Sequence, residues 1–437
     1  MTTNPADQPI ASLLRKALAW NYLSILLFGL SGLGAMGWIA YVYQASALGF
    51  FNLVNALYIV LSQLVTIGIH NSVLARLASG GSKESDAGEI VSSAVALVAL
   101  VSFPLSVTLY FASDGIGSFF NSPDMAFGLK VLCPALFVFS INKVVLFSLN
   151  GLGEVRIFAL GQSFRFAAIF FSVVTISLCT TEPKWLAISF LIADLSLAVL
   201  FIGYFFSRNL IIVPPSFAWV RSHWLYGVKG FGSGFFLTMN INVDVLILGL
   251  FVSQRDLGIY GLAAAIVVGL FHIFTALRMS FNPILANLIC GGRLSSVANL
   301  ISKARKYIIL GIIPSSTIVL TVLPFLIAQF LPDKGFEASW YLLLVLVPGV
   351  IVYGLFFPFD QMLLMGGYPG QQTVFNLIVL LSNIVLNFVL INFYGIWGAA
   401  IATSVVTVFI APLTLRILTK KHLDIDIFFP RRQVSIG

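Results

Sequence analysis

The chain has 437 residues, of which 59% are hydrophobic and only 9% are charged, and its formal net charge is +8. Because an ordinary soluble domain is about 25% charged, this composition excludes a soluble globular enzyme. Apolar runs follow one another with short gaps, and each has the roughly 20 residues that a helix needs to cross about 30 Å of hydrocarbon. The runs are continuously apolar rather than alternating, so they predict an all-α, polytopic membrane protein.

Twelve membrane-spanning helices are predicted in chain order. The first six lie at 18–43, 50–75, 88–112, 126–149, 157–180 and 185–207, and the second six lie at 228–252, 257–289, 305–331, 339–365, 372–394 and 396–419. The gap between the two sets, from Arg208 to Lys229, is the longest and carries Pro214 and Pro215. It predicts an N-terminal six-helix lobe at 1–212, a cytoplasmic inter-lobe linker at 213–227, a C-terminal six-helix lobe at 228–419 and a cytoplasmic tail at 420–437.

The orientation follows from the lysines and arginines, which concentrate on the cytoplasmic side of membrane proteins. If the N-terminus is cytoplasmic, 17 of the 24 basic residues fall in inner segments, 4 fall in outer segments and 3 lie inside spans. One miscounted helix would reverse the side of every later loop and destroy this bias. We therefore expect both termini in the cytoplasm, with the basic inner rim facing anionic membrane lipids rather than nucleic acid.

An internal repeat connects the two predicted lobes. The segments 48–66 and 257–275 are offset by 209 residues, and each opens the second helix of its half after a short outer turn. Two repeats of the same orientation predict pseudo-symmetric lobes related by an axis along the membrane normal, a plan that is common in secondary transporters. The identical positions are Leu48, Gly49, Leu53, Ala56, Leu61 and Thr66, which recur as Leu257, Gly258, Leu262, Ala265, Leu270 and Thr275.

The sequence lacks the motifs of catalytic and metal sites. The three cysteines, Cys133, Cys179 and Cys290, lie in or beside apolar runs, so they predict neither a disulfide framework nor a metal site. There is no phosphate-binding glycine loop, no histidine and cysteine metal spacing and no nucleophile elbow. No predicted outer loop is long enough to build an extracytoplasmic active site. We therefore expect a transporter without a cofactor, rather than an enzyme.

Four stretches of sequence resemble the bacterial polysaccharide and O-antigen flippase family. They are LNGLGEVRIFALGQSFR at 149–165, VDVLILGLFVSQRDLGIYGLAAAI at 243–266, FNPILANL at 281–288 and NIVLNFVLINFYGIWGAAIATSVV at 383–406. Together they extend over most of the chain. The positions that carry the resemblance are Asp244, Gly258, Tyr260, Ala263, Pro283, Asn387, Gly395, Gly398, Ala399 and Ala400.

The resemblance implies membership of a superfamily that also contains multidrug and lipid II exporters, with twelve helices in two MATE-like lobes. It implies an undecaprenyl-diphosphate-linked oligosaccharide as cargo, moved across the bacterial inner membrane by alternating access for O-antigen, capsule or exopolysaccharide assembly. Polysaccharide polymerase and chain-length proteins are the implied partners, and a proton or sodium ion is the expected coupling ion. The alternatives are a multidrug or lipid II exporter of the same superfamily and, in another class, a membrane-embedded polysaccharide polymerase or ligase.

Three cations inside predicted spans are candidates for a cationic, substrate-binding cavity, because charges at such depth are costly and rare. Arg165 lies about eight residues into span five, roughly 12 Å deep at 1.5 Å per residue, and its guanidinium suits phosphate oxygens. Lys143 in span four and Arg278 in span eight are the other two. The alternative for Arg165 is an internal pair with Asp194, and the alternative for Lys143 is snorkelling to the inner rim.

The candidate coupling residues are Asp194 in span six, Asp244 in span seven, Asp360 in span ten and His272 in span eight. Each carboxylate either binds a proton or sodium ion or neutralises an intramembrane arginine or lysine. Asp244 shares a helix face with Asn240 at the i, i+4 spacing, and the flippase resemblance includes an acid at this position. His272 is either a protonation site or a histidine hydrogen-bonded between helices.

Overall fold

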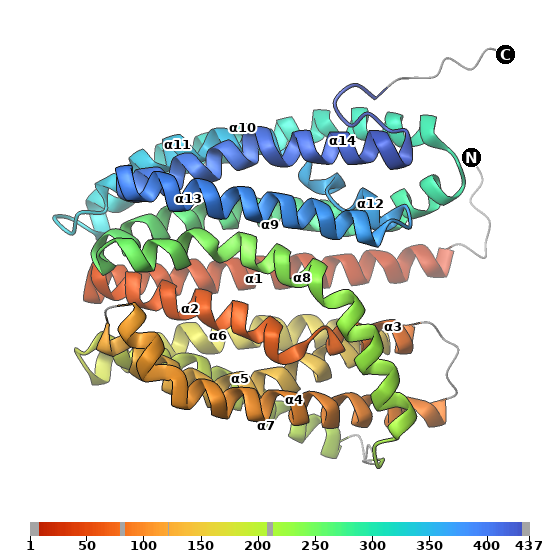
Figure 1. Ribbon diagram of the computed structural model, residues 1–437, viewed down its shortest axis with the longest axis horizontal. Helices are drawn as coiled ribbons and strands as arrows, with labels where there is room; N and C mark the ends of the chain where they lie inside the picture. The colour runs from red at the N-terminus through yellow and green to blue at the C-terminus, as the bar shows by residue number, and fades with distance from the viewer. Residues whose placement is uncertain (1–7, 79–83, 121, 208–212, 431–437) are drawn as a thin grey trace. The chain divides into compact units, whose positions relative to one another are not determined.

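The structure is a computed structural model that describes residues 8–78, 84–120, 122–207 and 213–430. All regular secondary structure in these ranges is helical, which confirms the predicted all-α, polytopic class (Figure 1). The chain divides into two units. Unit 1 comprises Met1–Val42 and Leu57–Gly234, and unit 2 comprises Tyr43–Ala56 and Phe235–Gly437.

Unit 1 is built from the first α-helix, the end of the second, the next five and the start of the eighth. Its core lies where three of these helices meet, around Ile69, Ile90 and Val144, none of which is exposed. The predicted second span is broken at Ile67 and Gly68, where φ is positive. The elements are α1 (Gln8–Tyr43), the end of α2 (Ala45–Thr66), α3 (Ile69–Ala78), α4 (Glu84–Phe119), α5 (Pro123–Gly151), α6 (Val155–Cys179), η2 (Pro183–Ala187), α7 (Ile188–Ser207) and the first half of α8 (Phe217–Phe251).

Unit 2 holds the start of α2 and everything from the second half of α8 onward. Its predicted tenth span is divided into three pieces by a 3-10 turn at Phe357–Phe359, where Pro358 has no N–H to continue the α-helical hydrogen bonds. The elements are α9 (Gln254–Cys290), α10 (Leu294–Phe330), α11 (Glu337–Gly354), η3 (Phe357–Phe359), α12 (Met362–Met365), α13 (Pro369–Val405), η4 (Val406–Ile410) and α14 (Ala411–Leu423).

Eleven helical runs in the described part of the chain are long and apolar enough to cross a membrane. The last of them, Pro369–Leu423, has 55 residues and contains both of the last two predicted spans. Gly395 interrupts it with φ 54° and ψ −131°, a conformation that glycine adopts without steric cost. A Cβ on Gly398 would lie only 2.1 Å from the carbonyl oxygen of Leu390. The chain therefore folds back at Gly395, and α14 returns alongside α13 (Figure 1).

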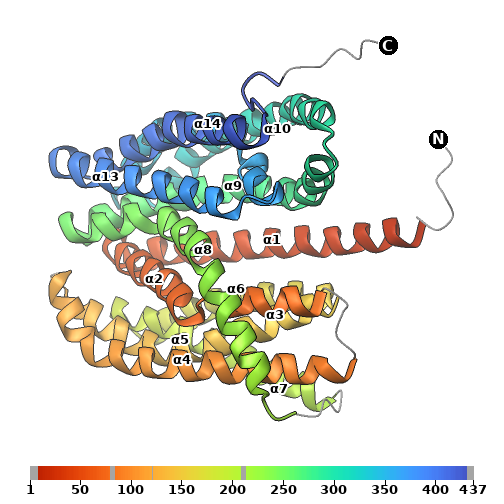
Figure 2. The same ribbon diagram turned by 45° about the vertical axis from the view of Figure 1, so that its right-hand side comes forward.

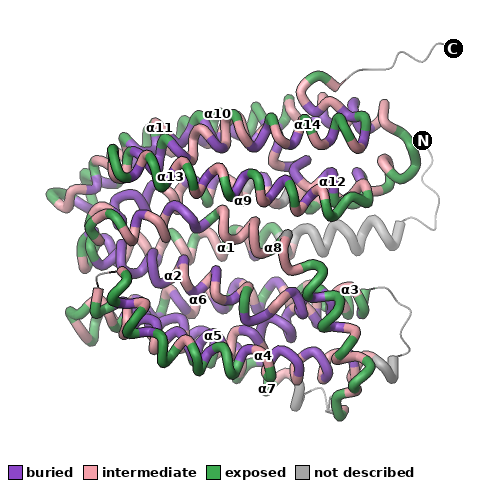
Figure 3. Tube along the Cα trace, viewed as in Figure 1, coloured by how far each residue is buried: buried purple, intermediate pink, exposed green. Residues whose placement is uncertain are grey.

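The outer faces of the helices carry large apolar side chains. Leu100 and Phe111 of α4 are 71% and 79% exposed, and Phe325 of α10 is 75% exposed. Figure 3 shows such exposed positions recurring along both helices. Exposed apolar surface of this extent is unfavourable in water but suits contact with lipid tails, as expected for membrane-spanning helices.

The two segments of the sequence repeat meet within unit 2. A Cβ on Gly49 of α2 would lie 1.8 Å from the carbonyl oxygen of Gln254, and a Cβ on Gly258 of α9 would lie 1.8 Å from that of Ala45. These contacts are equivalent under the offset of 209 residues, so the two helices cross about a local two-fold axis. Glycine at both positions is what permits the backbones to approach so closely.

The residues predicted as a linker, 213–227, are helical from Phe217 onward. Pro214 and Pro215 precede α8 and cannot continue a helix on their N-terminal side, whereas the residues after them extend α8 without a break into the predicted seventh span. Figures 1 and 2 both show the first half of α8 crossing α3 and α4. The two units of the structure are divided at other positions, near the start of α2, within α2 and within α8. The predicted domain limits therefore stay a prediction.

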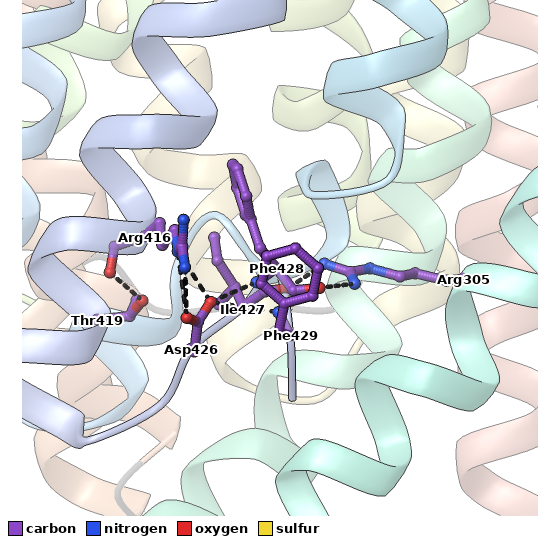
Figure 4. Close-up of polar contacts among 7 residues, drawn as sticks. All are labelled: Arg305, Arg416, Thr419, Asp426, Ile427, Phe428 and Phe429. Atoms are coloured by element: carbon purple, nitrogen blue, oxygen red, sulfur yellow. Dashed lines mark hydrogen bonds and ion pairs between the residues drawn. The ribbon is translucent and has the colours of Figure 1, made fainter. Parts of the chain in front are cut away.

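The segment after α14 is fastened to unit 2 by two arginines (Figure 4). Arg416 Nη2 lies 2.7 Å from Asp426 Oδ2, and Arg305 Nη1 donates to the carbonyl oxygen of Phe428 at 2.9 Å. The Phe428 ring packs on Phe356, with 4.9 Å between the ring centroids. These contacts connect the tail to α10, α14 and the end of α11.

Candidate functional site

Arg165 is buried in unit 1, where it forms an ion pair with Asp194. The Nε atom of Arg165 on α6 lies 2.6 Å from Oδ1 of Asp194 on α7. Its Nη2 atom donates to the Tyr58 hydroxyl of α2 at 2.7 Å, and that hydroxyl in turn donates to Asp194 Oδ2. Asn142 donates to the backbone oxygen of Asp194 at 2.8 Å. The Asp194 carboxylate joins α2, α6 and α7, and its backbone oxygen adds α5. The Arg165 guanidinium is thus satisfied internally.

Lys143 of α5 is buried close to this pair but has a different environment. Its Nζ atom lies 3.4 Å from the side-chain oxygen of Gln63 and 5.7 Å from the centroid of the Phe139 ring. Arg165 lies over the same ring at 4.5 Å. Within the described ranges no carboxylate lies within 4.0 Å of Lys143. Of these two neighbouring basic side chains, Arg165 pairs with a carboxylate, whereas Lys143 has no carboxylate partner in the described ranges.

Arg278 of α9 has an acidic partner in unit 2. Its Nη1 atom lies 3.0 Å from Oδ2 of Asp360, directly after η3, and its guanidinium lies 4.5 Å from the centroid of the Phe357 ring. Arg278 is half-buried and Asp360 is buried. His272 is half-buried on the same helix, six residues before Arg278. Like Arg165, Arg278 is neutralised by an aspartate of its own unit.

Asp244 of α8 is a buried acid that has no basic partner within 4.0 Å in the ranges that the structure describes. Its Oδ2 atom accepts hydrogen bonds from the hydroxyls of Tyr260 at 2.6 Å and Thr403 at 2.9 Å. Its Oδ1 atom and the side-chain oxygen of Asn387 are both buried, and neither has a hydrogen-bond partner in the described chain. Asn387 donates to Asn383, which donates to Asn240.

The contacts in the structure distinguish among the roles that the sequence predicted for these residues. For Arg165 the structure has the internal pair with Asp194, which was the alternative to a free cavity-lining cation. Substrate binding by Arg165 or Arg278 stays a prediction, and in either case a phosphate has to displace a carboxylate first. Lys143 differs because it meets an amide and an aromatic ring instead. Asp244 and Asp360 each leave a buried Oδ1 atom without a hydrogen-bond partner in the described chain, but Asp360 is paired with Arg278. Asp244 is therefore the predicted coupling acid that combines an open oxygen atom with the lack of a basic partner among the described residues.

Sequence reasoning missed the neutral hydrogen-bonding residues of both sites. No role was assigned to Tyr58, which contacts Arg165, or to Gln63, which contacts Lys143. The same is true of Tyr260 and Thr403, which contact Asp244. A signal was available for Tyr58, because it lies well inside the predicted span 50–75 and away from the interfacial belts where tyrosine usually sits. No group of three or more metal-ligating His, Cys, Asp or Glu side chains occurs among the residues that are described.

The chain resembles one known protein family at the level of sequence. A family model described as "Polysaccharide biosynthesis protein" matches residues 107–334, more than half of the chain. A search of curated protein sequences finds no match.

Several solved structures have the same fold. The lipid II flippase MurJ in an inward closed conformation is 18% identical, with a TM-score of 0.70 over 92% of this chain and 87% of that chain. An inward-facing multidrug resistance MATE family transporter is 11% identical, with a TM-score of 0.73 over 93% and 96% of the two chains. The Vibrio cholerae MATE transporter VcmN in its bent form is 12% identical, with a TM-score of 0.64 over 96% and 99%. With the fold of these transporters and the match to its family model, the chain belongs to the polysaccharide biosynthesis protein family.

Proposed function

We propose that this protein is a flippase that carries an undecaprenyl-diphosphate-linked oligosaccharide across the bacterial inner membrane by alternating access. The family match supports a role in polysaccharide assembly, and the fold is that of proteins that move lipids or drugs. A sugar diphosphate cannot enter hydrocarbon unaided, because an unpaired buried charge is prohibitively costly. The protein must therefore offer the headgroup a compensating cation while the isoprenoid tail stays in lipid.

The observation that carries this proposal is the burial of Lys143 without a carboxylate partner in the described chain. Its ammonium group is buried among Gln63 and Phe139, so it lacks both a carboxylate and bulk water to stabilise its charge. A phosphate oxygen supplies what this environment lacks, and hydrogen bonds between ionised groups are about twice as strong as neutral ones. The excess positive charge beside the Arg165–Asp194 pair favours an anionic cargo over the cationic drugs of a multidrug exporter.

In this proposal Arg165 also exchanges one anionic partner, the Asp194 carboxylate, for another, the phosphate of the cargo. When a diphosphate reaches the site, its oxygens compete with Asp194 for the guanidinium. A carboxylate that loses its arginine in a buried setting becomes stable only if it gains a proton or another cation. Exchange at Arg165 thus requires that Asp194 take up a proton locally, with the Tyr58 hydroxyl bridging the two groups. The ion of the membrane gradient is assigned to a different site.

Asp244 is the proposed coupling site in unit 2. The open oxygen atoms of Asp244 and Asn387, together with the Thr403 hydroxyl, are hard oxygen donors that suit a proton or a sodium ion. An ion here neutralises an otherwise unpaired buried carboxylate. The membrane ion gradient would then provide the free energy that the chain, lacking a nucleotide-binding motif, does not draw from ATP.

The test is complementation of a deletion strain with variants that are expressed and inserted equally. Arg165→Ala should abolish surface polysaccharide while Arg165→Lys retains part of it, and Lys143→Gln should lower export about 10- to 100-fold, as expected for loss of a charge-assisted contact. Lys130→Gln is the matched control, since Lys130 lies on the same helix but is exposed and paired with Asp114. Lipid-linked units must accumulate on the inner leaflet. Units that are flipped but not joined would indicate a polymerase or ligase, and normal polysaccharide in Lys143→Gln would refute the role of this cation.

A further inference from the structure

The part of α8 that is long and apolar enough to cross a membrane begins at Gly234, and the first half of the helix precedes it. One face of this first half is fixed to α3 and α4 of the same unit. The fully buried His223 ring contacts the Ser72 hydroxyl of α3 at 2.9 Å and the carbonyl oxygen of Ile90 of α4 at 3.1 Å. One turn later, a Cβ on Gly227 would lie 2.5 Å from the carbonyl oxygen of Ile67. These contacts set the rotation of the helix and hence which residues face outward.

The outward residues combine apolar bulk with positive charge. Phe217 is 82% exposed, Leu225 48% and Val228 49%, and Trp224 is 41% exposed beside them. Arg221 and Lys229 are exposed on the same side of the helix. Large apolar side chains without a packing partner are unfavourable in water, whereas a helix that presents aromatic, aliphatic and basic residues together is typical of the membrane interface.

The stretch of sequence that contains this helix carries charge of a single sign. The sequence has no aspartate or glutamate between Asp194 and Asp244, and within this interval it carries Arg208, Arg221 and Lys229. A positively charged segment next to a span is attracted to anionic headgroups by about 1 kcal/mol per basic residue. The expected cytoplasmic position of this segment places it against the leaflet surface that the basic inner rim faces.

We propose that the outward face of α8, defined as Phe217, Arg221, Trp224, Leu225, Val228 and Lys229, binds anionic phospholipid. The two basic side chains contact phosphate groups, and the apolar side chains enter the boundary between headgroups and acyl chains. Because the opposite face is fixed through His223, bound lipid stabilises the docked position of α8 on α3 and α4. This surface is separate from the buried Lys143 and Asp244 sites and does not depend on the identity of the cargo.

The experiment uses the full-length protein in detergent micelles, with phosphatidylglycerol or phosphatidylcholine of identical acyl chains added in increasing amounts while thermal unfolding is followed. We expect phosphatidylglycerol to raise Tm at lower concentration than phosphatidylcholine. In the double variant Arg221→Gln/Lys229→Gln the half-saturating phosphatidylglycerol concentration should rise about 30-fold, the equivalent of two contacts of about 1 kcal/mol each. The control Lys420→Gln/Lys421→Gln removes the same charge from exposed positions on α14, outside this face, and should raise that concentration clearly less than the variant in α8 does.

A second measurement tests the depth of the apolar residues. In nanodiscs with brominated acyl chains, Trp224→Phe should reduce the quenchable tryptophan fluorescence, because Trp224 is placed at the lipid boundary. Equal phosphatidylglycerol dependence in the Arg221→Gln/Lys229→Gln variant and the parent would overturn the proposal, as would quenching that Trp224→Phe does not change. Either result would assign this face to a protein contact instead.

Discussion

Replacement of the Arg165–Asp194 pair separates its structural role from its proposed role in transport. The variants are Arg165→Met, Asp194→Asn and the double variant that carries both. Asp194 is fully buried and its ion pair measures 2.6 Å. Removing only the arginine leaves an uncompensated buried carboxylate, at a cost of about 4 kcal/mol. For a unit of about 200 residues, at roughly 3 °C per kcal/mol, Tm should fall by about 12 °C.

The double variant removes both charges, so the unpaired carboxylate disappears. What remains is the loss of the hydrogen bond from Arg165 to Tyr58, which costs about 1 kcal/mol, and Tm should recover to within about 3 °C of the parent. Surface polysaccharide in a complemented deletion strain is the second readout. Export should stay absent in the double variant even though stability returns, because no guanidinium is left to exchange Asp194 for phosphate. A stable double variant that exports normally would show that Arg165 serves only to neutralise Asp194.

Three further predictions concern groups outside this pair. Asp244→Asn should leave the protein folded but remove any dependence of export on the coupling ion, measured by varying sodium concentration and pH in vesicles. Burial lowers the pKa of His223 to about 4, so between about pH 6.5 and 4 only the unfolded chain gains a proton at this residue. The free energy of unfolding should therefore fall by about 3 kcal/mol as the pH is lowered through this window. In thermal unfolding, His223→Gln should abolish that pH dependence. Partial burial raises the pKa of Asp426, but hydrogen bonds from Arg416 and two backbone N–H groups lower it by more. Asp426→Asn should weaken the attachment of the segment after α14 by about 1 kcal/mol. The expected result is faster proteolysis of that segment.

The helices were predictable because the bilayer imposes a simple rule on the sequence. Apolar runs of sufficient length must become helices, and the described chain is mainly helical in each predicted span, with breaks inside the second and the tenth. The limits of the helices were less predictable. α10, for example, begins at Leu294, well before the predicted span at 305–331, because hydropathy detects the part in hydrocarbon and not the turns that continue into water. Gly395 falls in the short gap predicted between the last two spans, where the structure folds back.

The partners of the intramembrane charges could not be read from the sequence. Arg165 and Asp194 are 29 residues apart and lie on different helices, and no periodic pattern states how two helices are rotated toward each other. The spans predicted for both residues are apolar on all sides, which removes the amphipathic signal that reports rotation in soluble helices. The pair with Asp194 therefore stood as one of two alternatives for Arg165 until the side-chain geometry was known.

The two units differ in the sign of the buried ionisable side chain that lacks an ion-pair partner. In unit 1, Arg165 pairs with Asp194, and Lys143 has no carboxylate partner among the described residues. In unit 2, Arg278 pairs with Asp360, and Asp244 has no basic partner among them. A buried charge without a partner costs several kcal/mol, so each unit gains stability by binding a mobile charge of the opposite sign. Unit 1 is suited to an anion such as a phosphate group, and unit 2 is suited to a proton or a metal cation. If the anionic cargo binds in one unit and the coupling ion binds in the other, the two do not compete for the same residue. This arrangement requires that Lys143→Gln impair cargo binding but leave unchanged the ion dependence that Asp244→Asn removes.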